Sequence, residues 1–406
     1  MSDVKLTKME ISNYRSCVAT TFEPSSGLSV LIGPNGSGKT TVLSAFQLLS
    51  KLVNTIPPYR RRMIDPFSTA CVLKVGFNWK GYSITYEAKI SLVNNERNED
   101  EILDSEETWY SYSMTGSRKK IPLPLSSLGE AHSFRPHYYE SLSEYLGRHT
   151  RDQETGRTLT KAISAIANFV SDISYYSASI FTNPSSSPIS FEVESESGAR
   201  RGISISGHKK FLYDLYLSYK ANGDDFQNFK DVVGRNGVYL IDDLKFQEIE
   251  TSSSVYKVSV GGKITTKLKK NNLVIPNFII QKSSLSPSQL SEGTFKALAL
   301  IFYIITTHGP LMLIEEPEVC VHHGLLYSLI ELLKNYSQEK QIIVSTHSDQ
   351  LLDKVEINSV FKVIRGEEGT KVTNVKQGLN SDELSALKDY LANEGGLGEY
   401  WKHGDL

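Results

Sequence analysis

The sequence predicts an α/β fold in which a mixed sheet core is interrupted by a large α+β insertion. Three observations support this prediction. An apolar strand at residues 28–32 leads into a glycine-rich turn and then into an apolar stretch with helical spacing at 41–52. A comparable alternation of strands and helices returns only after about residue 275. The segment in between shows the period-two alternation that is typical of antiparallel hairpins.

These changes of pattern predict four segments. Residues 1–60 form the N-terminal part of the core, and residues 61–275 form the insertion. Residues 276–380 form the C-terminal part of the core, and residues 381–406 form a closing helix and tail. The elements expected in the last two segments are strands at 311–316, 341–346 and 360–365 and helices at 325–336 and 382–393.

Two stretches of the insertion predict β-hairpins. Residues 72–93 alternate between apolar and polar side chains, and Lys80-Gly81 supplies the turn. Residues 255–268 repeat this pattern around Gly261-Gly262. The acidic run at 95–107 is interpreted as a solvated loop. No sustained heptad pattern is found, which argues against a long coiled-coil arm.

The composition indicates a globular protein without a membrane span. The chain has 406 residues, of which 39% are hydrophobic and 22% charged. No apolar stretch approaches the roughly 18 residues of a membrane helix, and the polar N-terminus lacks the apolar core of a signal peptide. Three widely spaced cysteines are expected to be free thiols in a reducing compartment, so a cytoplasmic location is predicted. With a net charge of −2, any contact with nucleic acid has to come from local patches.

The turn after the first core strand predicts a phosphate-binding loop. The sequence GPNGSGKT, residues 33–40, fits G-x-x-x-x-G-K-[ST] at every fixed position, with a strand before it and a helix after it. Glycines allow the backbone N–H groups to approach phosphate closely, and the helix N-terminus adds partial positive charge. We expect Lys39 to reach the β- and γ-phosphates of ATP and Thr40 to offer its hydroxyl to Mg²⁺. The predicted ATP-binding residues of this loop are Gly33, Pro34, Asn35, Gly36, Ser37, Gly38, Lys39, Thr40 and Thr41.

Carboxylates follow the strand expected at 311–316, in the sequence LMLIEEPE. Because ligands of open α/β sheets bind at the carboxyl ends of strands, Glu315 is expected to hold Mg²⁺ directly or through water. Glu316 is expected to orient and deprotonate the attacking water, a role that typically contributes ~10²–10⁴ in rate. The next apolar strand ends in Ser-Thr-His, and His347 is predicted to reach the γ-phosphate. The alternative for this histidine is a purely structural role.

Together these elements resemble the ABC-type ATPases, and more narrowly the branch that includes RecF, SMC and OLD proteins. The opening LTKMEISNYRSC is similar to the first strand of that branch, and LSEGTFKAL is similar to its signature motif. The sequence LIEEPE followed by VHH resembles its Walker B region, and STHS resembles its switch histidine. The resemblance covers about residues 1–50 and 280–365.

The resemblance implies a site shared between two subunits. Ser291 and Gly293 would touch the γ-phosphate of ATP bound by another copy of the chain, so a homodimer or higher oligomer is expected. Read locally, Ser291 is the N-cap of the following helix, and the two interpretations are compatible. The chain departs from the family pattern at Glu315, where aspartate is usual, and at His323, where proline is common. Thr294 and Phe295 replace the second glycine and the glutamine of transporter signatures.

The insertion argues against two classes of ATPase, transporter subunits and true SMC proteins. It spans 291 − 40 = 251 positions, longer than in transporter subunits, and it lacks the coiled coil of a true SMC protein. The residues after the last expected strand are too few for the nuclease domain of OLD proteins. The tail and the stretch YYSASIFTNPSSSPISFE at 175–192 resemble stand-alone ATPases of the AAA_21 and AAA_15 type.

Three functions remain open from the sequence. The first is an ATP-hydrolysing sensor or regulatory subunit of a bacterial anti-phage defence system that controls a separately encoded effector, such as a nuclease or toxin. The second is a RecF-like repair or replication ATPase that binds DNA directly. The third is a nucleotide-locked scaffold. Basic clusters favour the second only weakly, because acidic residues balance them; they lie at Arg60–Arg62, Arg118–Lys120, Arg200-Arg201, Lys209-Lys210 and Lys267–Lys270.

Overall fold

The computed structural model describes residues 3–54, 59–60, 70–93, 102–112, 118–122, 153–194, 207–258, 264–319, 321–393 and 395–402. These residues form two compact units. Unit 1 consists of Met1–Tyr176, His308–Glu318 and Ile330–Leu406, and unit 2 consists of Ser177–Thr307 and Val319–Leu329. The division into four segments at residues 60, 275 and 380 stays a prediction.

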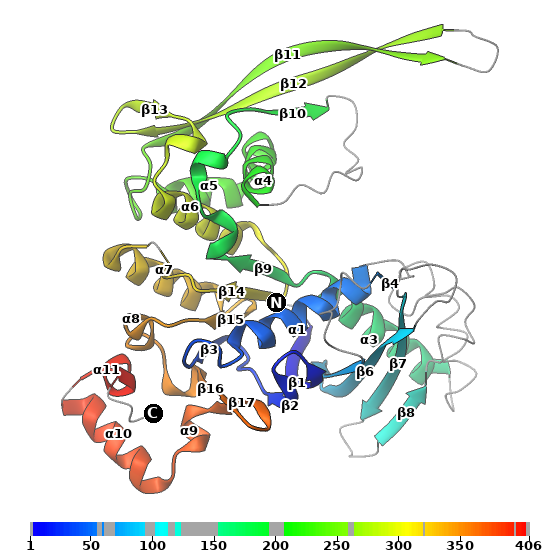
Figure 1. The fold of residues 1–406 in the computed structure, drawn as a ribbon, viewed down its shortest axis with the longest axis vertical. Coiled ribbons are helices and arrows are strands. Elements are labelled where there is room, and N and C mark those ends of the chain that lie inside the picture. The colour runs from blue at the N-terminus through cyan, green and yellow to red at the C-terminus, as the bar shows by residue number, and fades with distance from the viewer. Residues whose placement is uncertain are drawn as a thin grey trace. The chain divides into compact units, whose positions relative to one another are not determined.

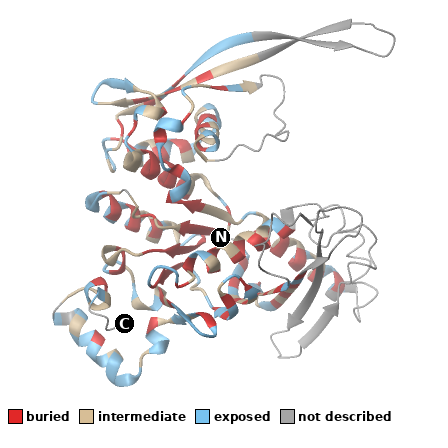
Figure 2. Cartoon of the chain, viewed as in Figure 1, coloured by how far each residue is buried: buried red, intermediate tan, exposed pale blue. Residues whose placement is uncertain are grey.

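The core of unit 1 contains a mixed six-stranded sheet of order β17-β16-β3-β15-β14-β9 (Figure 1). Strands β3, β14, β15 and β16 run parallel, and β17 pairs antiparallel with β16. The bounds are β3 Leu28–Ile32, β9 Ser174–Ser177, β14 Leu311–Glu315, β15 Gln341–Ser345, β16 Val360–Gly366 and β17 Gly369–Asn374. Every residue of β3 and β15 is buried, as expected of central parallel strands that are covered on both faces (Figure 2). The mixed sheet predicted from the sequence is therefore confirmed.

A second, antiparallel sheet of unit 1 has the order β2-β1-β5-β6-β7-β4, with β8 paired to β7. Its strands are β1 Val4–Tyr14, β2 Cys17–Phe22, β4 Tyr59–Arg60, β5 Ala70–Trp79, β6 Tyr82–Val93, β7 Ile102–Tyr112 and β8 Arg118–Pro122. The predicted hairpin at 72–93 is β5–β6. Its two-residue turn places Lys80 at φ 48° and Gly81 at φ 84°, the left-handed values of a type I′ turn.

One sequence-based interpretation of this region is wrong. Residues 102–107 of the acidic run belong to strand β7, which pairs with β6 along its length, rather than to a solvated loop. A run of charged side chains opposes burial of those side chains, but it does not prevent the backbone from pairing with a neighbouring strand. The earlier part of the run, residues 95–101, lies outside the described residues.

Helix α1, Lys39–Asn54, contacts strands of both sheets, namely β1 and β15, as well as helix α3, Gln153–Ser171. Its apolar residues belong to one continuous core with the strands. Phe46 of α1 is fully buried and meets Phe22 of β2 edge to face, at 6.4 Å between ring centroids. The loop that precedes α1 is thus anchored at both ends, by a central strand and by a buried helix.

The remaining helices of unit 1 follow the strands of the mixed sheet. Helix α7 covers His323–Tyr336 and begins in unit 2, and α8 covers Asp349–Leu352. After β17 come α9 Val375–Gly378, α10 Ser381–Asn393 and α11 Leu397–Lys402. The helices predicted at 325–336 and 382–393 are confirmed to within two residues at each end. Strand β17 was not among the elements that the sequence analysis singled out.

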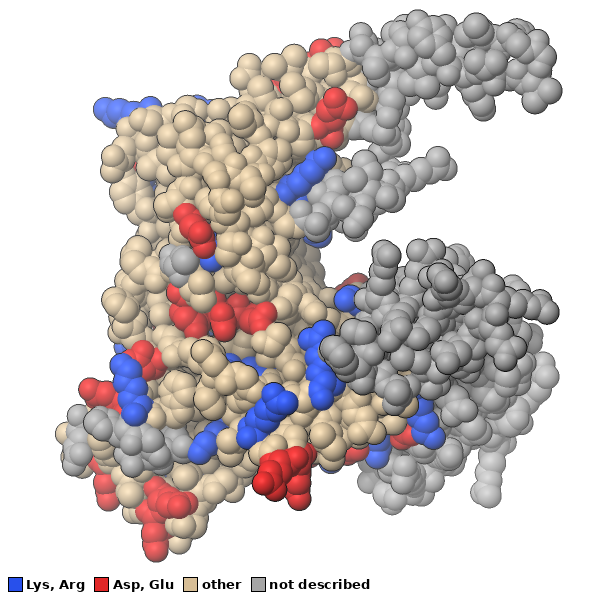
Figure 3. All heavy atoms as spheres, in the orientation of Figure 1, with Lys and Arg blue, Asp and Glu red and all other residues tan. Residues whose placement is uncertain are grey.

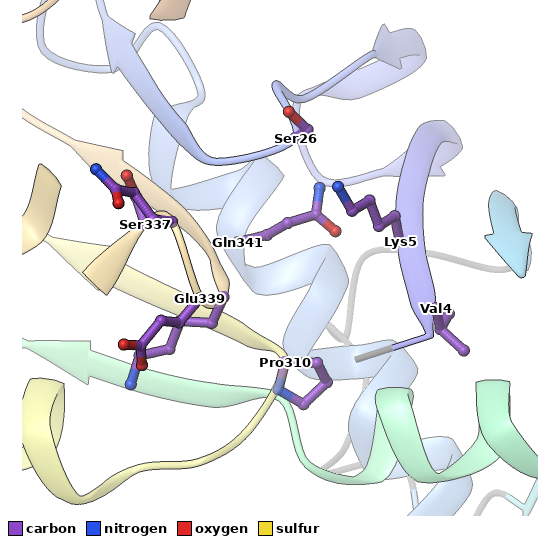
Figure 4. A pocket seen from close by; sticks show the side chains of 9 residues that line it. Val4, Lys5, Ser26, Pro310, Ser337, Glu339 and Gln341 are labelled. Carbon is purple, nitrogen blue, oxygen red and sulfur yellow. The ribbon is translucent and has the colours of Figure 1, made fainter. Parts of the chain in front are cut away.

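A side chain joins the two sheets at the amino end of β15. The Gln341 amide accepts a hydrogen bond from the Leu6 N–H at 2.8 Å and donates to the carbonyl oxygens of Leu6 and Ser25 at 3.0 and 3.1 Å. Figure 4 shows this side chain reaching toward β1 beside a cavity of about 30 Å³. The cavity lies at the amino ends of β14 and β15, away from the strand ends that carry the predicted site.

Unit 2 contains the sheet β10-β12-β11, with β13 paired to β12. Its strands are β10 Phe191–Glu194, β11 Asp243–Val258, β12 Ile264–Ile280 and β13 Ser283–Leu285, and its helices are α4 Gly207–Ala221, α5 Asp224–Val233 and α6 Glu292–Thr306. Helix α6 packs on α4 and α5 through aromatic rings, with Phe211 meeting both Phe295 and Phe302. The hairpin predicted at 255–268 is the distal part of β11–β12, and its glycine pair lies outside the described residues.

Two of the three cysteines lie among the described residues. Cys17 and Cys71 are buried free thiols, and burial raises the pKa of Cys71 to about 12. Cys320 lies outside the described residues. Within the described ranges, no helix combines the length and the apolar character that crossing a membrane requires.

Candidate nucleotide-binding site

The glycine-rich loop connects β3 to α1, as predicted. Its backbone takes left-handed φ values at Gly36 (77°) and Gly38 (109°), which L side chains adopt only under strain. The Ser37 N–H donates to the Pro34 carbonyl at 3.2 Å, and the Val42 N–H donates to the Gly38 carbonyl at 3.0 Å, so the loop passes directly into the helix. Pro34, Asn35 and Gly36 are exposed at its outer edge.

Gly38 is required because of what lies behind the loop. A Cβ atom at this position would stand 2.2 Å from Oγ1 of Thr370 and 2.9 Å from Oγ of Ser16. The Thr370 hydroxyl donates to the carbonyl of Ser37 at 3.0 Å, and it lies 2.9 Å from the Ser16 hydroxyl. The Ser16 hydroxyl in turn donates to Oγ1 of Thr41 at 3.2 Å. The turn after β1 and the start of β17 therefore support the loop through these two hydroxyl side chains.

Lys39 folds back over the loop. Its ammonium group donates to the carbonyl oxygens of Gly33 and Pro34 at 2.8 and 3.2 Å, and the residue is only 6% exposed. Burial lowers the pKa of this ammonium group. Three nearby carboxylates, those of Glu316, Glu318 and Glu315, act in the opposite direction. A buried cation next to exposed backbone N–H groups is suited to an anionic ligand.

The loop meets the end of strand β14 through Thr40 and Glu315. The Thr40 hydroxyl donates a hydrogen bond to Oε1 of Glu315, across 275 positions of sequence. The Tyr175 phenol of strand β9 donates to Oε2 of the same carboxylate at 2.5 Å. Both oxygens of Glu315 are therefore oriented by hydroxyl groups. The two residues predicted to bind Mg²⁺ lie side by side.

Glu316 occupies a sharp bend directly after β14. Its φ of 49° is left-handed, and its N–H donates to the Ser345 carbonyl at 2.9 Å. Oε1 of its side chain lies 3.8 Å from Nε2 of His347. A non-glycine residue in this conformation costs about 1–3 kcal/mol, and such strain is concentrated at functional sites.

His347 follows β15, as the sequence predicts. Its backbone N–H donates to Oε1 of Glu318 at 2.7 Å. Burial lowers the pKa of its imidazole, and the charge of Lys39 lowers it further, whereas Glu316 acts in the opposite direction. The imidazole is therefore favoured in its neutral form, so its contact with Glu316 is not a strong ion pair.

The site is acidic on one side and cationic on the other. In Figure 3, acidic side chains gather over the region where Figure 1 draws β14 and β15. Glu315, Glu316 and Glu318 all come from the end of β14 and the residues after it. The charge of Lys39 acts on these three carboxylates, and their excess of negative charge favours a divalent cation beside them.

The donor set fits Mg²⁺. This ion prefers oxygen ligands, retains several waters and typically takes only one or two protein carboxylates together with phosphate oxygens. Thr40 and Glu315 provide a hydroxyl and a carboxylate in contact with each other. Among the described residues, no cluster of three or more His, Cys, Asp or Glu side chains is arranged to hold a metal by itself. That result is expected where phosphate completes the coordination.

The signature residues lie in unit 2, at the start of helix α6. Ser291 is the N-cap: its side-chain oxygen accepts a hydrogen bond from the Thr294 N–H at 3.1 Å. Gly293 lies in the first turn of the helix. Behind this turn, the ammonium of Lys296, only 1% exposed, pairs with Glu292 at 2.6 Å. The capping role read from the sequence is confirmed, and the contact with ATP of a second subunit stays a prediction.

The motif after Walker B also differs locally from the family pattern. His322 accepts a hydrogen bond from the Leu325 N–H on Nδ1 at 3.3 Å, and His323 is the first residue of α7. The imidazole of His322 thus caps the helix that a proline often begins. The absence of proline at residue 323 leaves the start of the helix intact.

Sequence reasoning missed several residues of the site. Tyr175 lies in the stretch that was noted only for its resemblance to stand-alone ATPases, and Glu318 is the last residue of the quoted LMLIEEPE. Ser16 lies in the quoted opening LTKMEISNYRSC but was given no role, and Thr370 lies in no motif. The spacing of three carboxylates within four residues is the one signal that pointed to Glu318.

One protein-family model matches most of the chain. The family model AAA_21, described as "AAA domain, putative AbiEii toxin, Type IV TA system", matches residues 28–353, about four fifths of the chain. Two curated relatives are similar over a short segment: the DNA replication and repair proteins RecF of Marinomonas sp. (49% identity over 45 residues) and of Chlorobium luteolum (45% over 42 residues). The matched segments span 11% and 10% of this chain and 12% and 11% of the relatives.

Solved structures with a similar trace include SMC head domains. That of Thermotoga maritima has a TM-score of 0.44 and 12% identity, covering 91% of this chain and 99% of the other. That of Pyrococcus furiosus, bound to the C-terminal domain of ScpA, has a TM-score of 0.40 and 11% identity, covering 96% and 100%. These TM-scores and identities are low, so the similarity to a known family rests on the family model.

Proposed function

Because the chain belongs to the AAA_21 family of ABC-type, RecF/SMC-like P-loop ATPases, we propose that it binds ATP with Mg²⁺ and hydrolyses the γ-phosphate. One observation supports this proposal above the others. The Thr40 hydroxyl and the Glu315 carboxylate are in contact, at the point where the phosphate loop meets the end of β14. Lys39, Glu316 and His347 come from the same edge of the sheet.

The proposed chemistry assigns one task to each side chain. Lys39 leaves its two carbonyl partners and pairs with the β- and γ-phosphates. Glu316 accepts a proton from water as that water attacks the γ-phosphate, with its carboxylate 3.8 Å from the His347 imidazole. His347, in its neutral form, donates a hydrogen bond to a γ-phosphate oxygen. Bound Mg²⁺ neutralises developing phosphate charge, and Thr40 and Glu315 would hold it.

Completion of the site by a second copy is part of this proposal. The N-cap turn at Ser291 and Gly293 begins helix α6, and the N–H groups at a helix N-terminus attract anions. Placed against the γ-phosphate of ATP on a partner subunit, this turn would close the site and make turnover depend on association. The chain would then act as a homodimer or a higher oligomer.

Phosphate release by the purified protein tests the enzymatic proposal. Lys39→Ala should abolish nucleotide binding, and Glu316→Gln should retain binding and stop turnover. Glu367→Ala, an exposed residue of the β16–β17 turn, is the matched control and should behave like the wild type. Equal phosphate release from the wild type and Glu316→Gln would support the nucleotide-locked scaffold instead.

For the biological role, the proposal is a cytoplasmic sensor or regulatory subunit of a bacterial anti-phage defence system, acting on a separately encoded effector. The support is the family description, which names a putative toxin of a toxin–antitoxin system, together with the contact between Thr40 and Glu315 in the candidate ATPase site. Co-purification with the product of the neighbouring gene, lost in Lys39→Ala, is the expected result. Phage protection that persists in Glu316→Gln would contradict a role for turnover.

The RecF similarity favours a second candidate, an ATPase that acts on DNA directly. One segment fits this candidate: residues 251–280 contain no acidic residue and five lysines, at 257, 263, 267, 269 and 270. Most of these residues belong to the paired strands β11 and β12. A two-stranded ribbon can enter the major groove of DNA. Binding of duplex DNA that weakens with salt, and that drops in Lys267→Ala/Lys269→Ala/Lys270→Ala but not in Lys209→Ala, would support it.

A further inference from the structure

Glu318 links the two strand ends that carry the proposed chemistry. It lies three residues after Glu315, and its Oε1 accepts a hydrogen bond from the backbone N–H of His347 at 2.7 Å. The side chain of Thr346 forms a second hydrogen bond with this carboxyl group. The other oxygen, Oε2, is buried and has no hydrogen-bond partner among the described residues. Burial raises the pKa of the Glu318 carboxyl group.

A carboxyl group in this position is costly. A carboxyl group with one buried, unpaired oxygen loses hydration that its hydrogen bonds with the His347 N–H and the Thr346 side chain do not fully restore. A smaller or apolar side chain would avoid this cost if the position only filled space. We therefore expect Glu318 to have a role other than filling space at this position.

Two hydrogen bonds connect the end of β14 with the end of β15 near Glu318. The Glu316 N–H already joins the end of β14 to the Ser345 carbonyl at the end of β15. Two residues beyond each of these positions, the Glu318 carboxyl group forms a second link by accepting a hydrogen bond from the N–H of His347. Between these two links lie the Glu316 carboxylate and the His347 imidazole, with Oε1 and Nε2 3.8 Å apart. The two links fix how these side chains face each other.

We propose that Glu318 is a positioning residue for hydrolysis, which orients His347 toward Glu316 and the γ-phosphate without itself touching the nucleotide. This inference rests on the proposed ATPase function. It assigns Glu318 neither to the metal nor to the attacking water, because its Oε1 is engaged by a backbone N–H rather than directed at Thr40. A displacement of about 1 Å in a catalytic group can cost ~10² in rate, so losing this hydrogen bond should affect turnover far more than binding.

The test compares Glu318→Ala, Glu318→Gln, His347→Ala and the double variant Glu318→Ala/His347→Ala. Glu318→Ala should lower the single-turnover rate by about 10²-fold while the Kd for a fluorescent ATP analogue changes less than threefold. Glu318→Gln keeps a carbonyl oxygen for the His347 N–H and should restore most of the rate. The double variant should be no slower than His347→Ala, because Glu318 acts through His347.

A second measurement does not depend on hydrolysis. Hydrogen exchange at the His347 amide should accelerate in Glu318→Ala and remain slow in Glu318→Gln and in the surface control Glu367→Ala. If the wild type lacks ATPase activity but shows this exchange pattern, the proposed function fails while the positioning contact stands. Multiplicative loss in the double variant, a rise in Kd that matches the loss of rate, or unchanged exchange in Glu318→Ala would each overturn the inference.

Discussion

The phenol of Tyr175 donates a hydrogen bond to Oε2 of Glu315 at 2.5 Å, on the side of the carboxylate opposite to Thr40. Tyr175 comes from β9, and Glu315 is the last residue of β14 in the same sheet. Glutamate is one methylene longer than the aspartate usual at this position of the family, so its carboxylate has more freedom. The phenol removes that freedom and turns Oε1 toward the Thr40 hydroxyl.

Replacing this phenol should therefore weaken the proposed metal site. Tyr175→Phe removes only the hydroxyl, and the Mg²⁺ concentration needed for half-maximal nucleotide binding should rise about 10-fold or more, as for other partners of metal ligands. Titration with Mn²⁺, followed by electron paramagnetic resonance, measures the same change without turnover. Tyr82→Phe, which alters a tyrosine that is 40% exposed, is the control. An unchanged metal requirement in Tyr175→Phe would show that the phenol is structural only.

Glu316→Gln should trap an ATP-bound assembly. The amide keeps the size of the side chain and cannot accept a proton, so turnover should fall by ~10²–10⁴ while ATP binding is retained. If two subunits close on ATP, this variant should elute as a larger species with ATP than with ADP in size-exclusion chromatography. Hydrolysis near the wild-type rate would exclude Glu316 as the base.

Two substitutions of Ser291 distinguish its capping role from its proposed role in a partner's site. Ser291→Ala loses the hydrogen bond from the Thr294 N–H and should cost about 1 kcal/mol of stability in chemical denaturation. Ser291→Arg adds a bulky cation at the same turn and should prevent association while each subunit still binds ATP. Steady-state turnover and sedimentation measured on both variants distinguish the effects. Normal turnover of Ser291→Arg would contradict the shared site.

The stability of the protein without ligand should depend on pH through His347. Its pKa is lowered in the folded state, chiefly by burial, so the unfolded state binds the proton first as the pH falls below about 6.5. The free energy of unfolding should therefore decrease as the pH falls from about 6.5 to the lowered folded-state pKa, and level off below it. His347→Gln should lack this part of the decrease. Urea denaturation of both proteins between pH 5 and 8 measures the difference, and parallel curves would contradict the prediction.

Gly38→Ala should damage the phosphate loop. The added Cβ would collide with the Thr370 hydroxyl, and a φ of 109° is strained for alanine, so the loss of stability should be about 1–3 kcal/mol. Nucleotide affinity should fall as well, because the loop has to move away from Thr370. Gly366→Ala is the control, since no atom lies within 4 Å of the added Cβ there. Thermal denaturation and nucleotide titration of the two variants give the comparison.

Local patterns in the sequence were sufficient for the elements that carry the proposed chemistry. The strand at 28–32, the loop at 33–40 and the following helix are short-range features, because apolar periodicity and glycine positions depend only on neighbouring residues. The carboxyl ends of β14 and β15 could be inferred for the same reason, and with them Glu315, Glu316 and His347. Capping by Ser291 is likewise a property of a single turn.

Only the tertiary structure decided which distant residues support these groups. Tyr175 reaches Glu315 because β9 joins the edge of the sheet beside β14, and Thr370 supports Gly38 because β17 returns to the phosphate loop. Glu318 meets the His347 N–H because two parallel strands end side by side. Strand pairing of this kind depends on the packing of the whole core rather than on local propensity. No periodicity or motif in the sequence therefore predicts these contacts.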